Sequence, residues 1–167
     1  NNVLPFWLQN SQDKEFGGYF TCLDREGKVF DTDKFIWLQG REVWMFSMLY
    51  NKVEKRQEWL DCAVQGGEFL KKYGHDGNYN WYFSLDRSGR PLVEPYNIFS
   101  YTFATMAFGQ LSLATGNQEY ADIARKTFDI ILSKVDNPKG KWNKLHPDTR
   151  NLKNFALPMI LCNLAME

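Results

Sequence analysis

The chain has 167 residues, which is enough for one domain with a sizeable core. Its 20 Lys and Arg residues balance its 20 Asp and Glu residues. This balance argues against nucleic acids and anionic membranes as main partners, because proteins that bind either usually carry more basic than acidic residues. Aromatic residues make up 16% of the chain, a proportion that fits either a bulky core or a site where flat rings stack on a sugar.

Hydrophobic periodicity predicts six helical segments along the chain. They lie at residues 2–10, 33–51, 54–73, 97–115, 117–135 and 152–167. Segments 19–30 and 82–92 each have an extended aromatic start, an Asp-Arg-x-Gly turn and a return strand, which predicts two β-hairpins. The hairpins recur about sixty residues apart, each before an apolar helix, and this spacing indicates an internal repeat.

The predicted helices alternate in charge. Residues 95–118 and 154–166 contain no charged side chain, and residues 35–50 contain only Arg41 and Glu42. The helices between these stretches carry charges on one face, as expected where one side meets water. This alternation favours an all-α fold, with helix hairpins in two concentric rings and short β-hairpins at one end, over a plain bundle. Three inner helices make half a ring, so we expect residues 1–167 to be the N-terminal half of one barrel domain, truncated at both ends.

The strongest functional signal lies in the first apolar helix. Trp37, Arg41 and Trp44 are spaced at i, i+4 and i+7 and therefore share one stripe. A lone arginine between two tryptophans on an inner helix is costly unless it meets an anion or a polar ligand. Gly40 costs roughly 1 kcal/mol relative to alanine within a helix, which indicates that a backbone or a ligand approaches closely there.

Other readings of the charged residues remain open. Arg41 could pair with Glu42 or Glu94 and only hold helices together. The same two glutamates are candidates for glycoside hydrolysis, although the sequence gives no reason for them to face each other. His75 and His146 sit beside turn-forming residues, and we expect both at the surface.

A second candidate group lies at the start of the next apolar helix. Asn97, Ser100 and Tyr101 occupy its first turn, and Trp37 and Gln39 occupy the corresponding end of the preceding apolar helix. These side chains could converge on the mouth of a cavity. The alternative is that they form a helix cap and core aromatics.

Several motifs together resemble the N-acylglucosamine 2-epimerase family. They are Pro5-Phe-Trp-Leu, Asp13-Lys-Glu-Phe-Gly-Gly-Tyr-Phe20, Trp37-Leu-Gln-Gly-Arg41, Pro95-Tyr-Asn-Ile-Phe-Ser100 and Leu157-Pro-Met-Ile-Leu161. The family includes the animal renin-binding protein, and its relatives are cellobiose and mannose epimerases or isomerases. The resemblance implies an (α/α)6 barrel.

The resemblance also implies a reaction, the interconversion of N-acetylglucosamine and N-acetylmannosamine. A base removes the C2 proton of the open-chain sugar to give an enediolate, and an acid on the other face returns a proton. Two histidines in the second half of the family's barrel do this work, and neither His75 nor His146 matches their motifs. The residues that carry over are Arg41, as the catalytic cation facing the C1 oxyanion, and a set that lines or adjoins the sugar pocket: Trp37, Tyr101, Gln39, Asn97 and Phe99.

Partners and cofactors follow from the same resemblance. We expect a small sugar substrate, a homodimer when the protein is complete, and no metal or cofactor; some members use ATP as an activator, but no nucleotide site is visible here. Three distant cysteines without metal-ligand spacing, and no visible signal peptide or membrane span, fit a cytoplasmic protein. The alternatives are a cellobiose 2-epimerase or aldose-ketose isomerase, a glycan hydrolase on the same toroid, and a non-catalytic binding module.

Overall fold

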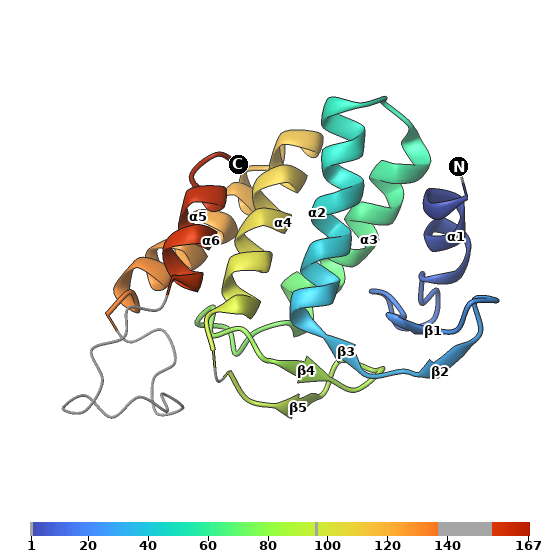
Figure 1. Cartoon of the computed structure of the whole chain (residues 1–167), viewed down its shortest axis with the longest axis horizontal. Helices are drawn as coiled ribbons and strands as arrows, with labels where there is room; N and C mark the ends of the chain where they lie inside the picture. Colours follow the sequence, from blue (N-terminus) through green and yellow to red (C-terminus); the bar gives the residue numbers. More distant parts are fainter. Residues whose placement is uncertain (1, 96, 137–154) are drawn as a thin grey trace.

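The computed structural model describes residues 2–95, 97–136 and 155–167, and these residues are mostly helical (Figure 1). The helices are α1 (Val3–Asn10), α2 (Ile36–Lys52), α3 (Gln57–Tyr73), α4 (Phe99–Thr115), α5 (Gln118–Ser133) and α6 (Ala156–Leu164). The short strands are β1 (Cys22–Leu23), β2 (Val29–Asp31), β3 (Lys34–Phe35), β4 (Ser84–Leu85) and β5 (Pro91–Val93).

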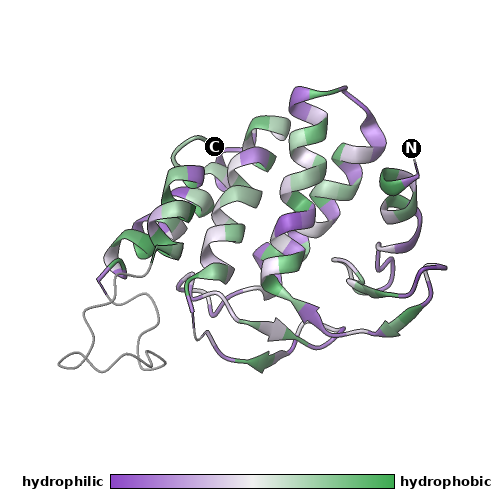
Figure 2. Cartoon of the chain, in the orientation of Figure 1, coloured by the Kyte–Doolittle hydropathy of each residue, from purple (hydrophilic) through white to green (hydrophobic). Residues whose placement is uncertain are grey.

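The helices form two layers, as the charge alternation predicted. Helix α4 packs between α2 and α6 in one layer, whereas α3 packs behind α2 and α5 behind α4 (Figure 1). Helix α4 carries mainly apolar residues along its length (Figure 2). Helix α3 buries one stripe that includes Trp59, Ala63, Gly67 and Leu70, and its charged residues face outward. This arrangement of inner and outer helices is that of an (α/α)6 toroid.

The two repeated hairpins are present and share their turn geometry. Strands β1 and β2 pair antiparallel, as do β4 and β5. The carboxylates of Asp24 and Asp86 each accept the backbone N–H four residues later, at 2.8 and 2.9 Å. Gly27 and Gly89 have φ values of 88° and 95°, a region that favours glycine. The Asp-Arg-x-Gly motif is therefore explained by turn formation.

The start of the first inner helix differs from the prediction. A helix was predicted from residue 33, but residues 34–35 form β3, which pairs antiparallel with β4 of the second hairpin. The backbone N–H of Ile36 continues this pairing by donating to the carbonyl oxygen of Phe83 at 3.0 Å. The extended backbone thus links the two repeats, a long-range contact that local periodicity does not report.

A buried group of charges ties three segments together beneath α2. The side chains of Asp13 and Lys34 are fully buried, and Lys34 Nζ lies 3.0 Å from Asp13 Oδ2. Arg87 Nε donates to the same carboxylate oxygen at 2.9 Å. Although burial alone raises it, hydrogen bonds from Arg87 and Lys34 lower the pKa of Asp13 to about 2. This Asp13 cluster joins the turn after α1, the start of α2 and the second hairpin.

Large aromatic residues fill the space between the layers. Trp81 and Tyr19 are fully buried, and each has a hydrogen-bond partner: the Trp81 indole donates to Thr127 Oγ1 at 3.1 Å, and the Tyr19 hydroxyl donates to the carbonyl oxygen of Cys62 at 2.8 Å. The cysteines at positions 22, 62 and 162 are unpaired. In the described ranges, no helix is both long and apolar enough to cross a bilayer.

Candidate functional site

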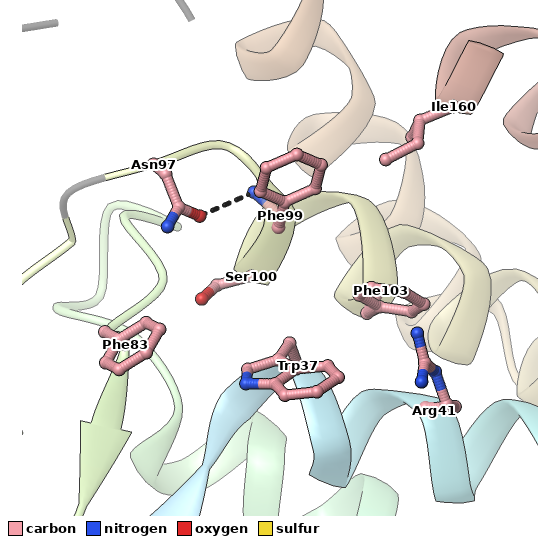
Figure 3. A pocket seen from close by; sticks show the side chains of 8 residues that line it. All are labelled: Trp37, Arg41, Phe83, Asn97, Phe99, Ser100, Phe103 and Ile160. Carbon is pink, nitrogen blue, oxygen red and sulfur yellow. Dashed lines mark hydrogen bonds between the residues drawn. The ribbon is translucent and has the colours of Figure 1, made fainter. Parts of the chain in front are cut away.

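A pocket of about 420 Å³ lies between the N-terminal halves of α2 and α4, beside the second hairpin (Figure 3). We call it the aromatic pocket. Its lining is Trp37, Arg41, Phe83, Asn97, Phe99, Ser100, Phe103 and Ile160. Four of these eight side chains are aromatic, and Arg41 is the only charged group among them. Such a surface suits the apolar faces of a sugar together with one developing negative charge.

Arg41 is held by rings rather than by a carboxylate. Its guanidinium carbon lies 4.5 Å from the ring centre of Phe103 and 5.1 Å from that of Trp37. Among the described residues, no hydrogen bond or ion pair to Arg41 is present, so the pairing with Glu42 or Glu94 considered above is not seen. Its donors are therefore available to a ligand in the pocket.

Gly40 explains how the two walls of the pocket come together. A Cβ at this position would lie 2.8 Å from the carbonyl oxygen of Phe103. Glycine allows the α4 backbone to approach α2 here, which confirms the close approach predicted from the sequence. The same contact places Phe103 beside Arg41.

Two further predicted residues line the aromatic pocket from the start of α4. Asn97 Oδ1 accepts the backbone N–H of Phe99 at 2.9 Å, which leaves the amide nitrogen of Asn97 on the pocket side (Figure 3). The Phe99 ring is 36% exposed. Both the cap and the pocket readings of Asn97 are thus compatible with the structure.

The structure places Gln39 and Tyr101 outside this pocket. Gln39 is fully buried, with Oε1 accepting the N–H of Tyr19 and Nε2 donating to the Tyr19 carbonyl oxygen, both at 2.8 Å. Tyr101 is 2% exposed, and its hydroxyl accepts from Lys134 Nζ at 2.9 Å and donates to Asn80 Oδ1 at 3.3 Å. Burial raises the pKa of Tyr101 to about 12. Both side chains hold the scaffold together.

A second cavity of about 260 Å³ shares Arg41 with the aromatic pocket. We call it the Glu42 cavity. Its lining is Trp7, Thr21, Leu38, Arg41, Glu42 and Met45. Glu42 is 8% exposed, its carboxyl contacts the Ser11 hydroxyl, and burial raises the pKa of Glu42 to about 8. Glu94 is exposed and lines neither cavity.

The remaining candidates fall elsewhere. His75 is half-buried rather than fully at the surface, because its ring stacks on Tyr79 at 4.8 Å and packs edge-on against Trp81. Burial lowers the pKa of His75. His146 lies outside the described residues. In the part of the chain that the structure describes, no three His, Cys, Asp or Glu residues are placed to hold a metal.

The sequence interpretation missed three pocket residues, Phe83, Phe103 and Ile160, whereas Ser100 was among those expected at the mouth of a cavity. Phe103 had a local signal, since it follows Phe99 by four residues and shares its helix face. Phe83 and Ile160 reach the pocket only through the pairing of β3 with β4 and the packing of α6 against α4. These contacts carry no local sequence signal.

Comparison with known proteins agrees with this architecture. Residues 18–167 match the family model for N-acylglucosamine 2-epimerase (GlcNAc 2-epimerase). The N-acylglucosamine 2-epimerase of Bos taurus is 41% identical over the whole chain, which covers 41% of that protein. The solved cellobiose 2-epimerase from Bacillus thermoamylovorans superimposes with a TM-score of 0.70 at 29% identity, over 78% of this chain and 34% of that one. A solved D-mannose isomerase, at 20% identity, gives a TM-score of 0.79 over 99% of this chain and 43% of its own, and shows the shared fold.

The α/α toroid of this chain is thus shared with solved sugar epimerases. The chain belongs to the N-acylglucosamine 2-epimerase family. It spans about two fifths of the length of the curated relatives that it matches.

Proposed function

We propose that this chain supplies the N-terminal half of the barrel of a sugar 2-epimerase that interconverts N-acetylglucosamine and N-acetylmannosamine. Identity of 40–41% to four mammalian N-acylglucosamine 2-epimerases supports this choice of substrate over cellobiose, because the cellobiose 2-epimerases are 27–29% identical. The complete enzyme is proposed to act as a homodimer in the cytoplasm and to need no cofactor.

The observation that carries the proposal is the Arg41 guanidinium, which lies over the rings of Trp37 and Phe103 and has no ion-pair partner among the described residues. Removal of the C2 proton from the open-chain sugar turns the C1 aldehyde into an enediolate, whose oxygen gains negative charge. A fixed cation in a ring-lined pocket favours this intermediate over the neutral aldehyde, and only that difference accelerates the step. The bases that move the proton belong, in this proposal, to the second half of the barrel.

A glycan hydrolase and a non-catalytic binding module lack a comparable observation. Hydrolysis of a glycan needs two opposed carboxylates roughly 5–10 Å apart. Glu42 and Glu94 do not share a cavity, and no carboxylate among the described residues lines the aromatic pocket. A binding module has no need of an unpaired cation inside an apolar pocket.

Solvent exchange at C2 tests the proposed route. The complete enzyme is incubated with N-acetylmannosamine in heavy water, and the product is examined by NMR. We expect deuterium at C2 of the product, because each base equilibrates with water before it returns a proton. Full retention of protium at C2 would refute the enediolate route, and an absence of turnover would favour a binding module.

A further inference from the structure

Arg41 forms part of the wall between two cavities, and the two differ in chemistry. On one side lies the aromatic pocket, which offers the guanidinium only rings and neutral polar groups. On the other side lies the Glu42 cavity, which contains a carboxyl group from the next residue of α2. No ion pair joins Arg41 to Glu42 in the described part of the chain. A guanidinium beside a buried carboxyl group, yet unpaired with it, needs an explanation.

The hydrogen bonds of Ser11 explain why Arg41 and Glu42 are not paired. The Ser11 hydroxyl has a single hydrogen but two acceptors within reach: the carbonyl oxygen of Trp7, at 2.6 Å, and Glu42 Oε1. An ionised Glu42 would compete with Trp7 for that hydrogen. A protonated Glu42 instead donates its own hydrogen to Ser11, and the hydroxyl then donates to Trp7. Each contact then has a hydrogen of its own, whereas an ionised Glu42 would leave the two contacts to share one.

The surroundings of Glu42 favour the same state. The groups facing it from neighbouring elements are the Ser11 hydroxyl after α1, the Tyr19 hydroxyl from the following turn and the Cys62 thiol of α3. Burial raises the pKa of Cys62 to about 12 and that of Tyr19 well above its usual value, so both remain neutral. Within the described ranges, the cation that lines the Glu42 cavity is Arg41 itself.

We propose that Glu42 is a positioning residue for Arg41. In its neutral form it leaves the guanidinium over Trp37 and Phe103, whereas in its ionised form it draws the guanidinium into the Glu42 cavity and away from the substrate. The inference rests on the proposed function, because it takes the aromatic pocket as the sugar site. It predicts that the enzyme loses activity at alkaline pH when Glu42 ionises, since a carboxylate in the same cavity is a strong partner for arginine.

The protonation state is tested first, by a measurement that does not depend on activity. The complete protein is labelled with ¹³C at the glutamate carboxyl carbon, and its NMR spectrum is followed from pH 5 to 10. We expect one carboxyl resonance that titrates near pH 8 and is absent from Glu42→Gln, or from Glu42→Met if the first variant does not fold. A Glu42 resonance that is already ionised at pH 6 would overturn the inference and leave the proposed epimerase function intact.

The link to Arg41 is tested by pH profiles of kcat/KM. One pH unit above the pKa of Glu42, about one tenth of the enzyme keeps a neutral Glu42, so wild-type kcat/KM should be about tenfold below its plateau. Glu42→Gln should show less than half of that decline, and in an Arg41→Ala background the same change should leave the profile unaltered. Superimposable profiles of wild type and Glu42→Gln would overturn the inference, as would an equal shift in both backgrounds. A residue that only stabilises the fold would not move the alkaline limb.

Discussion

Replacing Gly40 with alanine would force apart the two walls of the aromatic pocket. The added Cβ would lie 2.8 Å from the carbonyl oxygen of Phe103 and 2.9 Å from its carbonyl carbon, whereas ordinary contact begins at 3.4 Å. The α4 backbone would therefore have to move by about 0.6 Å, because no flexible side chain is there to yield. Overpacking of this kind costs about 1–3 kcal/mol, and we expect the upper end since the obstacle is backbone.

Alanine also favours the helix by about 1 kcal/mol relative to glycine, which leaves a net loss of about 2 kcal/mol in the free energy of unfolding. The assay is denaturant unfolding of the complete protein, followed by circular dichroism. Gly109→Ala is the matched control: Gly109 also lies inside a helix, α4, but apart from its chain neighbours and its own helix backbone, no atom of the described residues lies within 4 Å of its added Cβ. We expect the control to be about 1 kcal/mol more stable than wild type. If Gly40→Ala were as stable as Gly109→Ala, close contact between α2 and α4 would not be the reason for the glycine.

Three further predictions concern the site and the chain as a whole. Arg41→Ala in the complete enzyme should lower kcat by about 10²–10³, with a smaller effect on KM. Arg41→Lys should recover only part of the lost kcat. A folded Arg41→Ala enzyme with undiminished kcat would show that Arg41 is not part of the site. The pKa of Glu42 rises from 4.5 in the unfolded chain to about 8 when folded, so burying this carboxyl costs little near pH 4 and on the order of 3 kcal/mol at pH 7. The stability gained by Glu42→Gln should therefore grow from pH 4 to pH 7. A gain that does not depend on pH would contradict this prediction. Residues 1–167 alone should show no epimerase activity, and turnover by the purified chain would refute this prediction. The same chain should aggregate or dimerise through its open apolar edges, and a monodisperse monomer in sedimentation would refute that prediction.

The sequence predicted features that depend on local chemistry or on helix-wide composition. The Asp-Arg-x-Gly turns were found because Asp24 and Asp86 bond to their own backbone. The two helix layers were found because burial on all sides excludes charge over a whole helix. Gly40 was found because a glycine inside a helix is unfavourable without a compensating contact.

Gln39 and Tyr101 were predicted to lie at the pocket but lie outside it, because the prediction placed them on the wrong face of their helices. Gln39 follows Trp37 by two residues, and Tyr101 follows Phe99 by two. Two residues correspond to about 200° of rotation on an α-helix, so each side chain faces away from the pocket residue before it. Gln39 binds Tyr19, which is 20 residues distant in the chain, and Tyr101 binds Asn80 and Lys134, which are 21 and 33 residues distant. Helix geometry could have excluded both residues from the pocket, but only the tertiary structure identifies what they bind.

The Asp13 cluster also bears on how this sequence can diverge. One buried carboxylate pairs with both Lys34 and Arg87, and Arg87 also pairs with Glu15. Loss of Asp13 alone would leave a fully buried lysine without its counter-charge, which is far more costly than losing an exposed pair. Evolutionary substitutions at positions 13, 34 and 87 are therefore expected to occur jointly or not at all. Covariation among these three positions would mark distant homologues that keep the same attachment of the second hairpin to the first inner helix.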